Sequence, residues 1–443
     1  MSMVAKLASL LEKVLGAETE AFALKHGVIQ RKRKFTGQSL LRMLVLTLLK
    51  KPDATYADWA LTAAQGGVMV TATAVEKRFT QPLVDFLREA LNMVLGQVLA
   101  AEAVDIELLR RFTGLFIGDS SSIRLPDEMR IEFPGCGGTE GSGAAALKIQ
   151  VRWDLKTGVL PQALIEIGKA SDAKSPIAHQ APQAGALEIF DLGYFSVKRF
   201  RRLHDAKAFF VSRLQYGTAV FDEHGQAVSL RTFLPANAVD GVVDVPVQLG
   251  QSERLKCRLI AVRVPEEMAN RRRQKARDKA RKRGSQLSAE YTELLGWSLF
   301  VTNAPDELLT WKEVVVLYRA RWQIELLFKL WKSHNQLAQQ RAGATALEVM
   351  AVLWSKLIGV MLQHWLLLTA VWPDGRRSLF KAARALRDWI TPLLLVLDHR
   401  PQLEQILTQL QTHLKCVAKI QRRRKHPSHF QLINDPALLN WNP

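Results

Sequence analysis

The sequence predicts an α/β protein in which a β-containing central region lies between helical regions at both ends. Near the two ends, apolar residues recur with helical spacing, whereas the middle contains short β-rich segments separated by turns. The chain has 443 residues, of which 48% are hydrophobic and 8% aromatic. This composition is typical of a folded globular protein and not of a disordered one.

Residues 1–112 are predicted to form a helical DNA-binding domain. An apolar helix is expected in "GQSLLRMLVLTLLKK", after the basic run "RKRK" at 31–34. Thr55 then caps a short helix that stops at Gly66, and "TATAVEKRF" gives a second short helix. This is the outline of a helix-turn-helix. Two short helices joined by glycine also occur in bundles that bind no DNA, so the pattern alone leaves both interpretations open.

Residues 113–215 are predicted to form the first part of an α/β core. A β-rich run, "GLFIGD", ends at Asp119. The segment "ALKIQVRWD" alternates apolar with polar residues, which predicts a half-buried strand. A Gly-rich loop, 135–146, lies between these two strands. "ALEIF" is a short buried strand that breaks at Asp191, and "AFFVSRL" is another.

Residues 216–296 are predicted to form a β-rich insertion that carries a basic run. In residues 271–283, nine basic side chains accompany one acidic side chain. The second part of the core, 297–343, returns to a strand at "WSLFVTN". Thr310 and Glu313 then form a T-x-x-E capping box that begins a helix. Residues 344–443 are predicted to be helical, with a second basic cluster at 422–425.

The charge balance predicts an anionic partner. The chain has 61 Lys and Arg against 42 Asp and Glu, a net charge of +19, and nucleic acid is the usual partner for such an excess. Three widely spaced cysteines form neither a disulfide framework nor a zinc motif, which favours the cytoplasm. The apolar stretch 347–372 is interrupted by Lys356, Gln363 and His364. We therefore expect buried helices there and no membrane span.

The segment "YRARWQIELLFKLWK", 318–332, carries a narrow polar stripe on an otherwise apolar helix. At about 100° per residue, its polar side chains share an arc of about 60°. They are Tyr318, Arg321, Glu325 and Lys332. A helix that is apolar nearly all round is normally buried, and buried charges need partners. A buried ion-pair network is one explanation, and a catalytic site is the other.

Three carboxylates favour the catalytic interpretation. Asp119 and Asp191 each follow an apolar strand, and Glu325 lies on the buried helix. Together they would bind two Mg²⁺ ions through oxygen ligands, as an RNase-H-like sheet does for phosphoryl transfer. Arg321 and Lys332, on either side of Glu325, would grip phosphates. An aspartate that closes a strand is more often a turn or helix cap, so each piece alone is weak.

The spacing Y-(2)-R-(3)-E-(6)-K of Tyr318, Arg321, Glu325 and Lys332 resembles the signature of bacterial insertion-sequence DDE transposases of the IS-four group. "DLGYFSVKRF" resembles the second-Asp region of that group, and "FIGDSSSIRLP" resembles the first. The resemblance covers 113–340. It implies an RNase-H-like core interrupted by a β-rich insertion, with Asp119, Asp191 and Glu325 as ligands of two Mg²⁺ or Mn²⁺ ions. The 133 residues between Asp191 and Glu325 suit such an insertion.

The resemblance also implies how DNA is held. Trp297 matches a tryptophan that stacks on a base flipped from the transposon end, although a tryptophan that begins a strand is more often a core residue. The basic run would contact the DNA backbone through Arg271, Arg272, Arg273, Lys275 and Lys279, and its alternative is a solvated helix face. Partners would be double-stranded DNA with terminal inverted repeats, target DNA and a second copy of the chain. The localisation would be cytoplasmic, at the bacterial nucleoid.

The sequence thus predicts a cut-and-paste DNA transposase. Two alternatives stay open: an RNase-H-like nuclease that cuts without joining, and a non-catalytic DNA-binding regulator derived from a transposase. Strand-transfer assays distinguish the first from a transposase, and metal-dependent nicking distinguishes the second.

Overall fold

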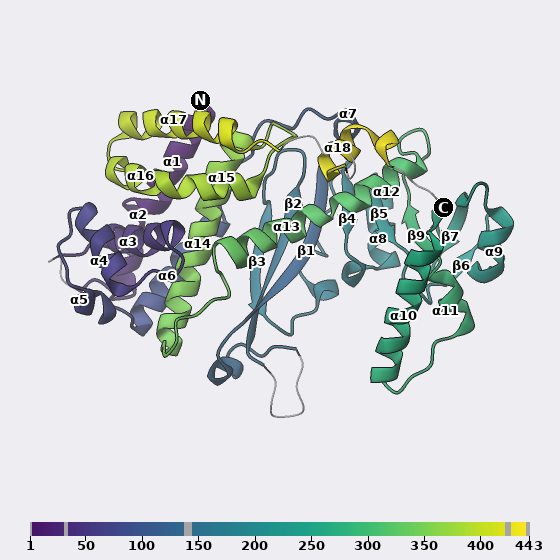
Figure 1. Cartoon of the computed structure of the whole chain (residues 1–443), viewed down its shortest axis with the longest axis horizontal. Helices are drawn as coiled ribbons and strands as arrows, with labels where there is room; N and C mark the ends of the chain where they lie inside the picture. The colour runs from purple at the N-terminus through teal and green to yellow at the C-terminus, as the bar shows by residue number, and fades with distance from the viewer. Residues whose placement is uncertain (1, 31–33, 137–143, 421–426, 440–443) are drawn as a thin grey trace. The chain divides into compact units, whose positions relative to one another are not determined.

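The computed structural model describes residues 2–30, 34–136, 144–420 and 427–439 (Figure 1). Its contacts divide the chain into two compact units, each built from three segments. Unit 1 comprises Met1–Asp105, Ser120–Ala170 and Ile324–Gln421, and unit 2 comprises Ile106–Asp119, Ser171–Gln323 and Arg422–Pro443. The basic cluster at 422–425 and most of the Gly-rich loop and of the "RKRK" run lie outside the described residues.

The N-terminal region of unit 1 is helical, as predicted. Thr55 caps its helix through a reciprocal capping box with Asp58, and Gly66 ends that helix. Thr71 caps the short helix that follows, because its side chain accepts a hydrogen bond from Ala74 N. The helices are α1 Met3–Leu15, α2 Glu18–Lys25, α3 Gly37–Lys50, α4 Tyr56–Gln65, α5 Ala72–Glu76 and α6 Gln81–Leu95.

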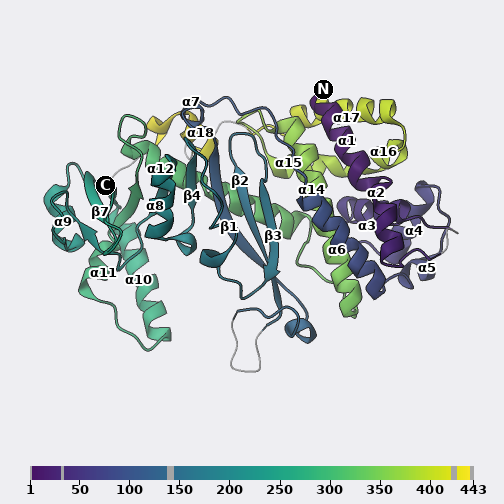
Figure 2. The same ribbon diagram turned by 180° about the vertical axis from the view of Figure 1, so that it is seen from behind.

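The C-terminal part of unit 1 is also helical and contains its central helix, α14 (Ala346–Val371). This helix is long and apolar enough to cross a membrane, but 83% of its most apolar window is buried inside the protein. It packs against α3, α6 and α17 in both views (Figures 1 and 2). The expectation of a buried core helix is therefore confirmed. The neighbouring helices are α15 Leu379–Leu386, α16 Ile390–Val396 and α17 Arg400–Val417.

Strand β2 (Ala146–Asp154) of unit 1 pairs antiparallel with β3 (Gln162–Ile167). The prediction of a half-buried β2 is wrong, because its polar residues Lys148, Gln150 and Arg152 are buried along with its apolar ones. Burial is tolerated because these groups find partners; the Gln150 amide, for example, donates to Glu166 on β3. Alternation alone therefore does not reveal whether a sheet face is exposed.

Unit 2 is built on a mixed sheet whose strands are ordered β1-β4-β5-β9-β8-β7-β6. The pairs β1–β4 and β4–β5 are parallel, and the remaining pairs are antiparallel. Strand β1 begins in this unit and continues into unit 1. The strands are β1 Leu115–Arg124, β4 Leu187–Phe190, β5 Phe209–Arg213, β6 Val220–Phe221, β7 Val242–Leu249, β8 Leu255–Arg263 and β9 Trp297–Thr302.

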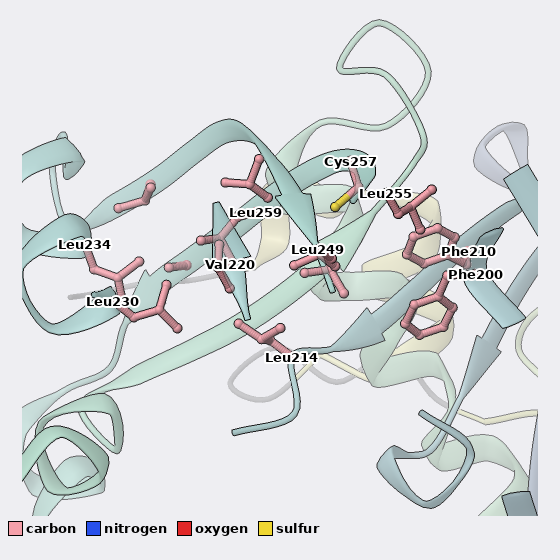
Figure 3. Packing of buried hydrophobic residues seen from close by; sticks show 14 of the residues in the cluster. Phe200, Phe210, Leu214, Val220, Leu230, Leu234, Leu249, Leu255, Cys257 and Leu259 are labelled. Carbon is pink, nitrogen blue, oxygen red and sulfur yellow. The ribbon is translucent and has the colours of Figure 1, made fainter. Parts of the chain in front are cut away.

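The β-rich segment after residue 216 extends this sheet, because β8 pairs with β9 and β9 pairs with β5. One apolar core joins residues on both sides of position 216 (Figure 3). In it, the Phe200 and Phe210 rings stack with centroids 4.3 Å apart, and Leu249 and Leu255 belong to the same cluster. Strands β7 and β8 therefore share one apolar core with β5 and α8.

The helices of unit 2 are α7 Glu107–Arg110, α8 Val197–Asp205, α9 Leu230–Asn237, α10 Glu266–Lys282, α11 Ala289–Leu294, α12 Trp311–Ala320 and α18 His429–Asn434. The basic run lies mainly on α10, so the segment predicted as β-rich also contains a long helix. Helix α13, Trp322–Lys329, crosses the boundary between the units.

Candidate active site at the ends of two parallel strands

Asp119 and Asp191 occupy equivalent positions on two neighbouring parallel strands. The pairing of β1 with β4 ends at Gly118 and Phe190, which are partners, and an aspartate follows each of them. The expectation that the strand itself ends at Asp119 is wrong, because β1 continues to Arg124. What ends at Asp119 is the pairing with β4, and that register brings the two aspartates to the same edge.

The Phe190 ring lies directly against Gly118. A Cβ at position 118 would be 1.9 Å from Phe190 Cε1, which is far inside van der Waals contact. Only glycine allows the ring to lie there, as expected where a strand glycine marks a close approach. Residues 118 and 190 therefore pack on one face of the sheet, and strand alternation turns the following aspartates to the other face.

Arg321 connects the two aspartates. Its Nη1 lies 2.9 Å from Asp119 Oδ2 and its Nη2 lies 3.5 Å from Asp191 Oδ1. The Arg321 and Asp119 side chains are 14% and 17% exposed, whereas that of Asp191 is 42% exposed. The two carboxylates already share one cation, the Arg321 guanidinium. Carboxylate oxygens are also the ligands that a hard divalent cation prefers. The two carboxylates therefore supply oxygen ligands of the kind that a divalent metal ion binds.

Asp191 occupies the N-cap position of a short turn without capping it through its side chain. It precedes a 3₁₀ turn, Leu192–Tyr194, but its side chain makes no capping hydrogen bond with that turn. The common structural role of an aspartate after a strand is therefore absent, which favours a role in binding. Among the described residues, no group of three or more His, Cys, Asp or Glu side chains is arranged to hold a metal ion.

Tyr318 lies on α12 and Arg321 is the residue that follows its last turn, and the start of α12 is fixed in unit 2. The capping box predicted for Thr310 and Glu313 is present, so this prediction is confirmed. Glu313 also forms an ion pair with Arg111, which precedes β1; Arg111 Nη1 lies 2.9 Å from Glu313 Oε1. The Arg321 guanidinium lies 5.8 Å from the centre of the Tyr318 ring, and burial raises the pKa of Tyr318. The tyrosine hydroxyl is thus kept as a neutral hydrogen-bonding group.

The helix after Arg321 is less regular than predicted. Helix α12 ends at Ala320, α13 follows, and a π-helical turn spans Leu330–His334. Trp322 and Leu326 are 49% and 37% exposed, so α13 is not buried all round. Glu325, partly buried, lies on the part of α13 that belongs to unit 1. The angular stripe estimated for a regular α-helix therefore does not extend across the π turn to Lys332.

Lys332 lies in that π turn and faces β1. Its Nζ donates a hydrogen bond of 2.7 Å to the Ser122 carbonyl, three residues beyond Asp119 in the sequence. Burial lowers the pKa of Lys332. A partly desolvated ammonium group binds anions more strongly than one in bulk water, which suits a phosphate contact.

Trp297 begins β9 and lines a cavity of 460 Å³ in unit 2. Arg231, Arg263 and Arg273 also line this cavity, as do Glu266 and Glu293. Glu293 pairs with Arg231, and Glu266 pairs with Arg273. Trp297 packs at the edge of the apolar core as well. Trp297 is thus partly buried against the core and partly accessible from the cavity.

The basic residues on α10 divide into two groups. Arg272 donates to the Trp297 carbonyl and to Ser298 Oγ, at 2.9 and 3.1 Å, and Arg273 forms an ion pair of 2.6 Å with Glu266. These two side chains attach α10 to the rest of the unit. Lys275 and Lys279 are exposed, and the exposed Arg271 pairs with Glu267 on the same helix. The exposed group therefore presents the positive charge to solvent.

Sequence reasoning missed a buried ion pair beside Asp191. Arg199 on α8 lies 2.5 Å from Glu188 on β4, and both side chains are less than 10% exposed. The signal was present, because Glu188 is a charged residue within an otherwise apolar strand, and a buried charge needs a partner. For Arg321 the sequence left both a phosphate contact and a buried ion pair open, but it did not identify Asp119 and Asp191 as the partners.

The mixed sheet, with an aspartate after the last paired position of β1 and of β4, fits the RNase-H-like fold of a class of phosphoryl-transfer enzymes. Residues 110–355, more than half of the chain, match the family described as the transposase DDE domain. The chain therefore belongs to the DDE transposases of bacterial insertion sequences and acts on DNA.

Known transposases are similar over most of the chain. A transposase of insertion sequence element IS231F from Bacillus thuringiensis subsp. israelensis is 24% identical, over 88% of this chain and 87% of its own length. That of IS231B from Bacillus thuringiensis subsp. berliner is 26% identical, over 72% and 70%. That of IS1151 from Clostridium perfringens is 25% identical, over 77% and 76%. DDE transposase domains depend on a divalent metal, typically Mg²⁺ or Mn²⁺.

Proposed function

We propose that this transposase cuts and joins the ends of its element by a cut-and-paste route in which Asp119, Asp191 and Glu325 bind the metal ions. The observation that carries the proposal is the shared register of Asp119 and Asp191, with Arg321 between their carboxylates. Glu325 follows Arg321 by four residues. It is the acidic residue of α13.

Two divalent ions, when bound, would supply activation of the attacking oxygen and stabilisation of the leaving oxygen. The side chains of the protein would bind and position these ions. Asp119 and Asp191 present acceptor-only oxygens at a fixed separation, because each follows a paired strand position. Arg321 keeps this acidic pair compact before metal arrives, since it neutralises part of the repulsion between the carboxylates.

DNA would be held on both sides of these carboxylates. We propose that Tyr318, Arg321 and Lys332 contact phosphates near the bond that is cut, with Arg321 exchanging a carboxylate for a phosphate oxygen. Trp297 would stack on a base extruded from the transposon end, because it lines a cavity and a tryptophan face suits stacking on a base. The exposed basic residues of α10 would contact the DNA backbone.

The remaining parts of the proposal concern partners. Residues 1–112 would bind the terminal inverted repeats, consistent with the two capped helices α4 and α5. Residues 113–215 and 297–343 would form the catalytic core, 216–296 the insertion, and 344–443 the C-terminal helical region. A homodimer would pair two transposon ends before joining them to target DNA. The protein would work in the bacterial cytoplasm, at the nucleoid.

The decisive experiment uses purified protein, Mg²⁺ or Mn²⁺, and labelled duplexes that carry the inverted repeats flanking the gene. Wild type is compared with Glu325→Gln and with Glu107→Gln, which changes an exposed acid on α7. We expect cleavage and joining to be lost only in Glu325→Gln, with DNA binding retained. Cleavage without joining in the wild type would favour a nuclease. DNA binding without cleavage by any of the three proteins would favour a regulator. Equal cleavage activity in all three would show that Glu325 is not a catalytic residue.

A further inference from the structure

A buried cluster lies on the face of the sheet opposite the two aspartates. The Arg199 guanidinium lies 3.6 Å from the centre of the Phe190 ring and forms the ion pair with Glu188. Arg199 is 8% exposed, Glu188 4% and Phe190 5%. Glu188 and Phe190 are two residues apart on β4, so strand alternation puts both on the same face. Arg199 therefore contacts two side chains of β4 from one side.

This cluster continues to β1. The Phe190 ring also lies 5.3 Å from the Tyr194 ring, measured between centroids, and close to Gly118, where a Cβ would lie 1.9 Å from it. The ring is thus packed between the backbone of β1 and the guanidinium of α8. Asp119 follows Gly118 and Asp191 follows Phe190, so the ring lies between the residues that precede both aspartates.

Helix α8 provides a firm support for the guanidinium. Ser196 caps its N-terminus by accepting a hydrogen bond from Arg199 N, and Phe200, the next residue, stacks on Phe210 of β5. Arg199 is consequently fixed at its backbone by the cap and at its side chain by Glu188. A planar group held at both ends can define where the ring lies, which a flexible lysine cannot do equally well.

We propose that Arg199 is a positioning residue which, through Phe190 and Glu188, sets the separation of the Asp119 and Asp191 carboxylates for a divalent metal ion. The inference rests on the proposed function, because it needs the two aspartates to be metal ligands. Arg199 does not touch the metal or the DNA in this scheme. Groups that orient metal ligands from behind typically change metal affinity by about 10- to 100-fold when they are removed.

A purely structural role is the alternative, since a buried ion pair in any sheet can support folding. The two roles make different predictions for a charge-neutral replacement. Removing one partner of a buried pair leaves an uncompensated charge and can unfold the protein, whereas replacing both partners is often tolerated. The double variant Arg199→Met with Glu188→Gln therefore removes the positioning group while sparing the fold.

The test measures Mn²⁺ binding by electron paramagnetic resonance on the full-length protein without DNA. The variants are Arg199→Lys, the double variant, Asp191→Asn and, as a matched control, Arg258→Lys. Arg258 forms a similarly shielded ion pair with Asp244 in the same unit, but between β8 and β7. Melting temperatures are recorded for each, and cleavage is assayed over a range of Mg²⁺ concentrations.

We expect the double variant to bind Mn²⁺ at least tenfold more weakly than wild type. The Mn²⁺ affinity of Arg199→Lys should be intermediate, and that of Arg258→Lys should equal the wild-type affinity. High Mg²⁺ should partly restore cleavage by the Arg199 variants. Wild-type Mn²⁺ affinity in folded Arg199→Lys and double-variant protein would overturn the inference. If Asp191→Asn also binds Mn²⁺ like wild type, the proposed metal ligands are wrong, which is a separate failure.

Discussion

Gly118 and Phe190 are register partners across the parallel strands β1 and β4, and the phenyl ring fills the space that a Cβ at position 118 would need. This relationship fixes where the two strands place Asp119 and Asp191. It also makes a small residue before the first aspartate a requirement of packing, independent of any contact with metal or DNA.

Enlarging Gly118 is expected to disturb both stability and cleavage. Gly118→Ala forces the Phe190 ring to move, and overpacking of this kind typically costs about 1–3 kcal/mol of the free energy of unfolding. Chemical denaturation measures that cost, and cleavage assays should show a larger loss than the folded fraction explains. Gly66→Ala is the control, because its nearest atoms are 3.5 Å away or more. Equal stability of both variants would contradict the close approach.

Arg321→Met is expected to lower stability most when no divalent metal is present. The guanidinium offsets repulsion between the Asp119 and Asp191 carboxylates, and its loss should cost about 1–2 kcal/mol, discounted for the exposure of Asp191. A bound divalent ion would replace that compensation, so Mg²⁺ should narrow the difference in melting temperature from wild type. Thermal denaturation with and without Mg²⁺ measures this. A difference that Mg²⁺ leaves unchanged would argue against a metal between these carboxylates.

The two groups of basic residues on α10 should behave differently. Replacing exposed Lys275 and Lys279 by glutamine should reduce the slope of log affinity against log salt by up to about 2 and leave stability unchanged. Arg272→Met should instead destabilise the protein, because that guanidinium bonds to the Trp297 carbonyl and Ser298. DNA-binding titrations at several salt concentrations, with denaturation curves, measure both. If the slope of log affinity against log salt is the same with and without Lys275 and Lys279, α10 does not contact DNA through these residues.

His364 should make the protein less stable in mild acid. Burial lowers its pKa from 6.5 to about 4 in the folded protein, where its Nε2 lies 2.8 Å from the Gly158 carbonyl. Between pH 6.5 and 4, His364 is protonated in the unfolded chain but stays neutral in the folded protein. The free energy of unfolding therefore falls as pH decreases from 6.5 to 4. The slope approaches about 1.4 kcal/mol per pH unit for this one proton.

His364→Gln should flatten that pH dependence by one proton, because glutamine does not titrate and can still donate to Gly158. Denaturation at a series of pH values measures the slope. His334 has a similarly lowered pKa of about 4 and remains in both proteins, so the informative quantity is the difference between them. Identical slopes would mean that His364 is protonated in the folded state.

The sequence by itself determined the local elements and most of the site's chemistry. Thr55 and Thr310 predicted their helix caps correctly, because a cap depends only on residues three positions apart. Asp119 and Asp191 were predicted as site residues because an aspartate after an apolar run is a local pattern, although β1 itself continues to Arg124. Membership in the transposase family, found first as a resemblance, was likewise confirmed over residues 110–355.

Tertiary structure decided how those residues meet. The β1–β4 register, the packing of Phe190 between Gly118 and Arg199, and the contacts of Arg321 with both aspartates join segments far apart in the chain. Helical and strand periodicity specify which side of an element is apolar, but not which residue of another element lies opposite. That choice depends on packing and charge compensation across the whole sheet. For the same reason, only the structure revealed that β2 buries its polar residues and that a π turn follows α13.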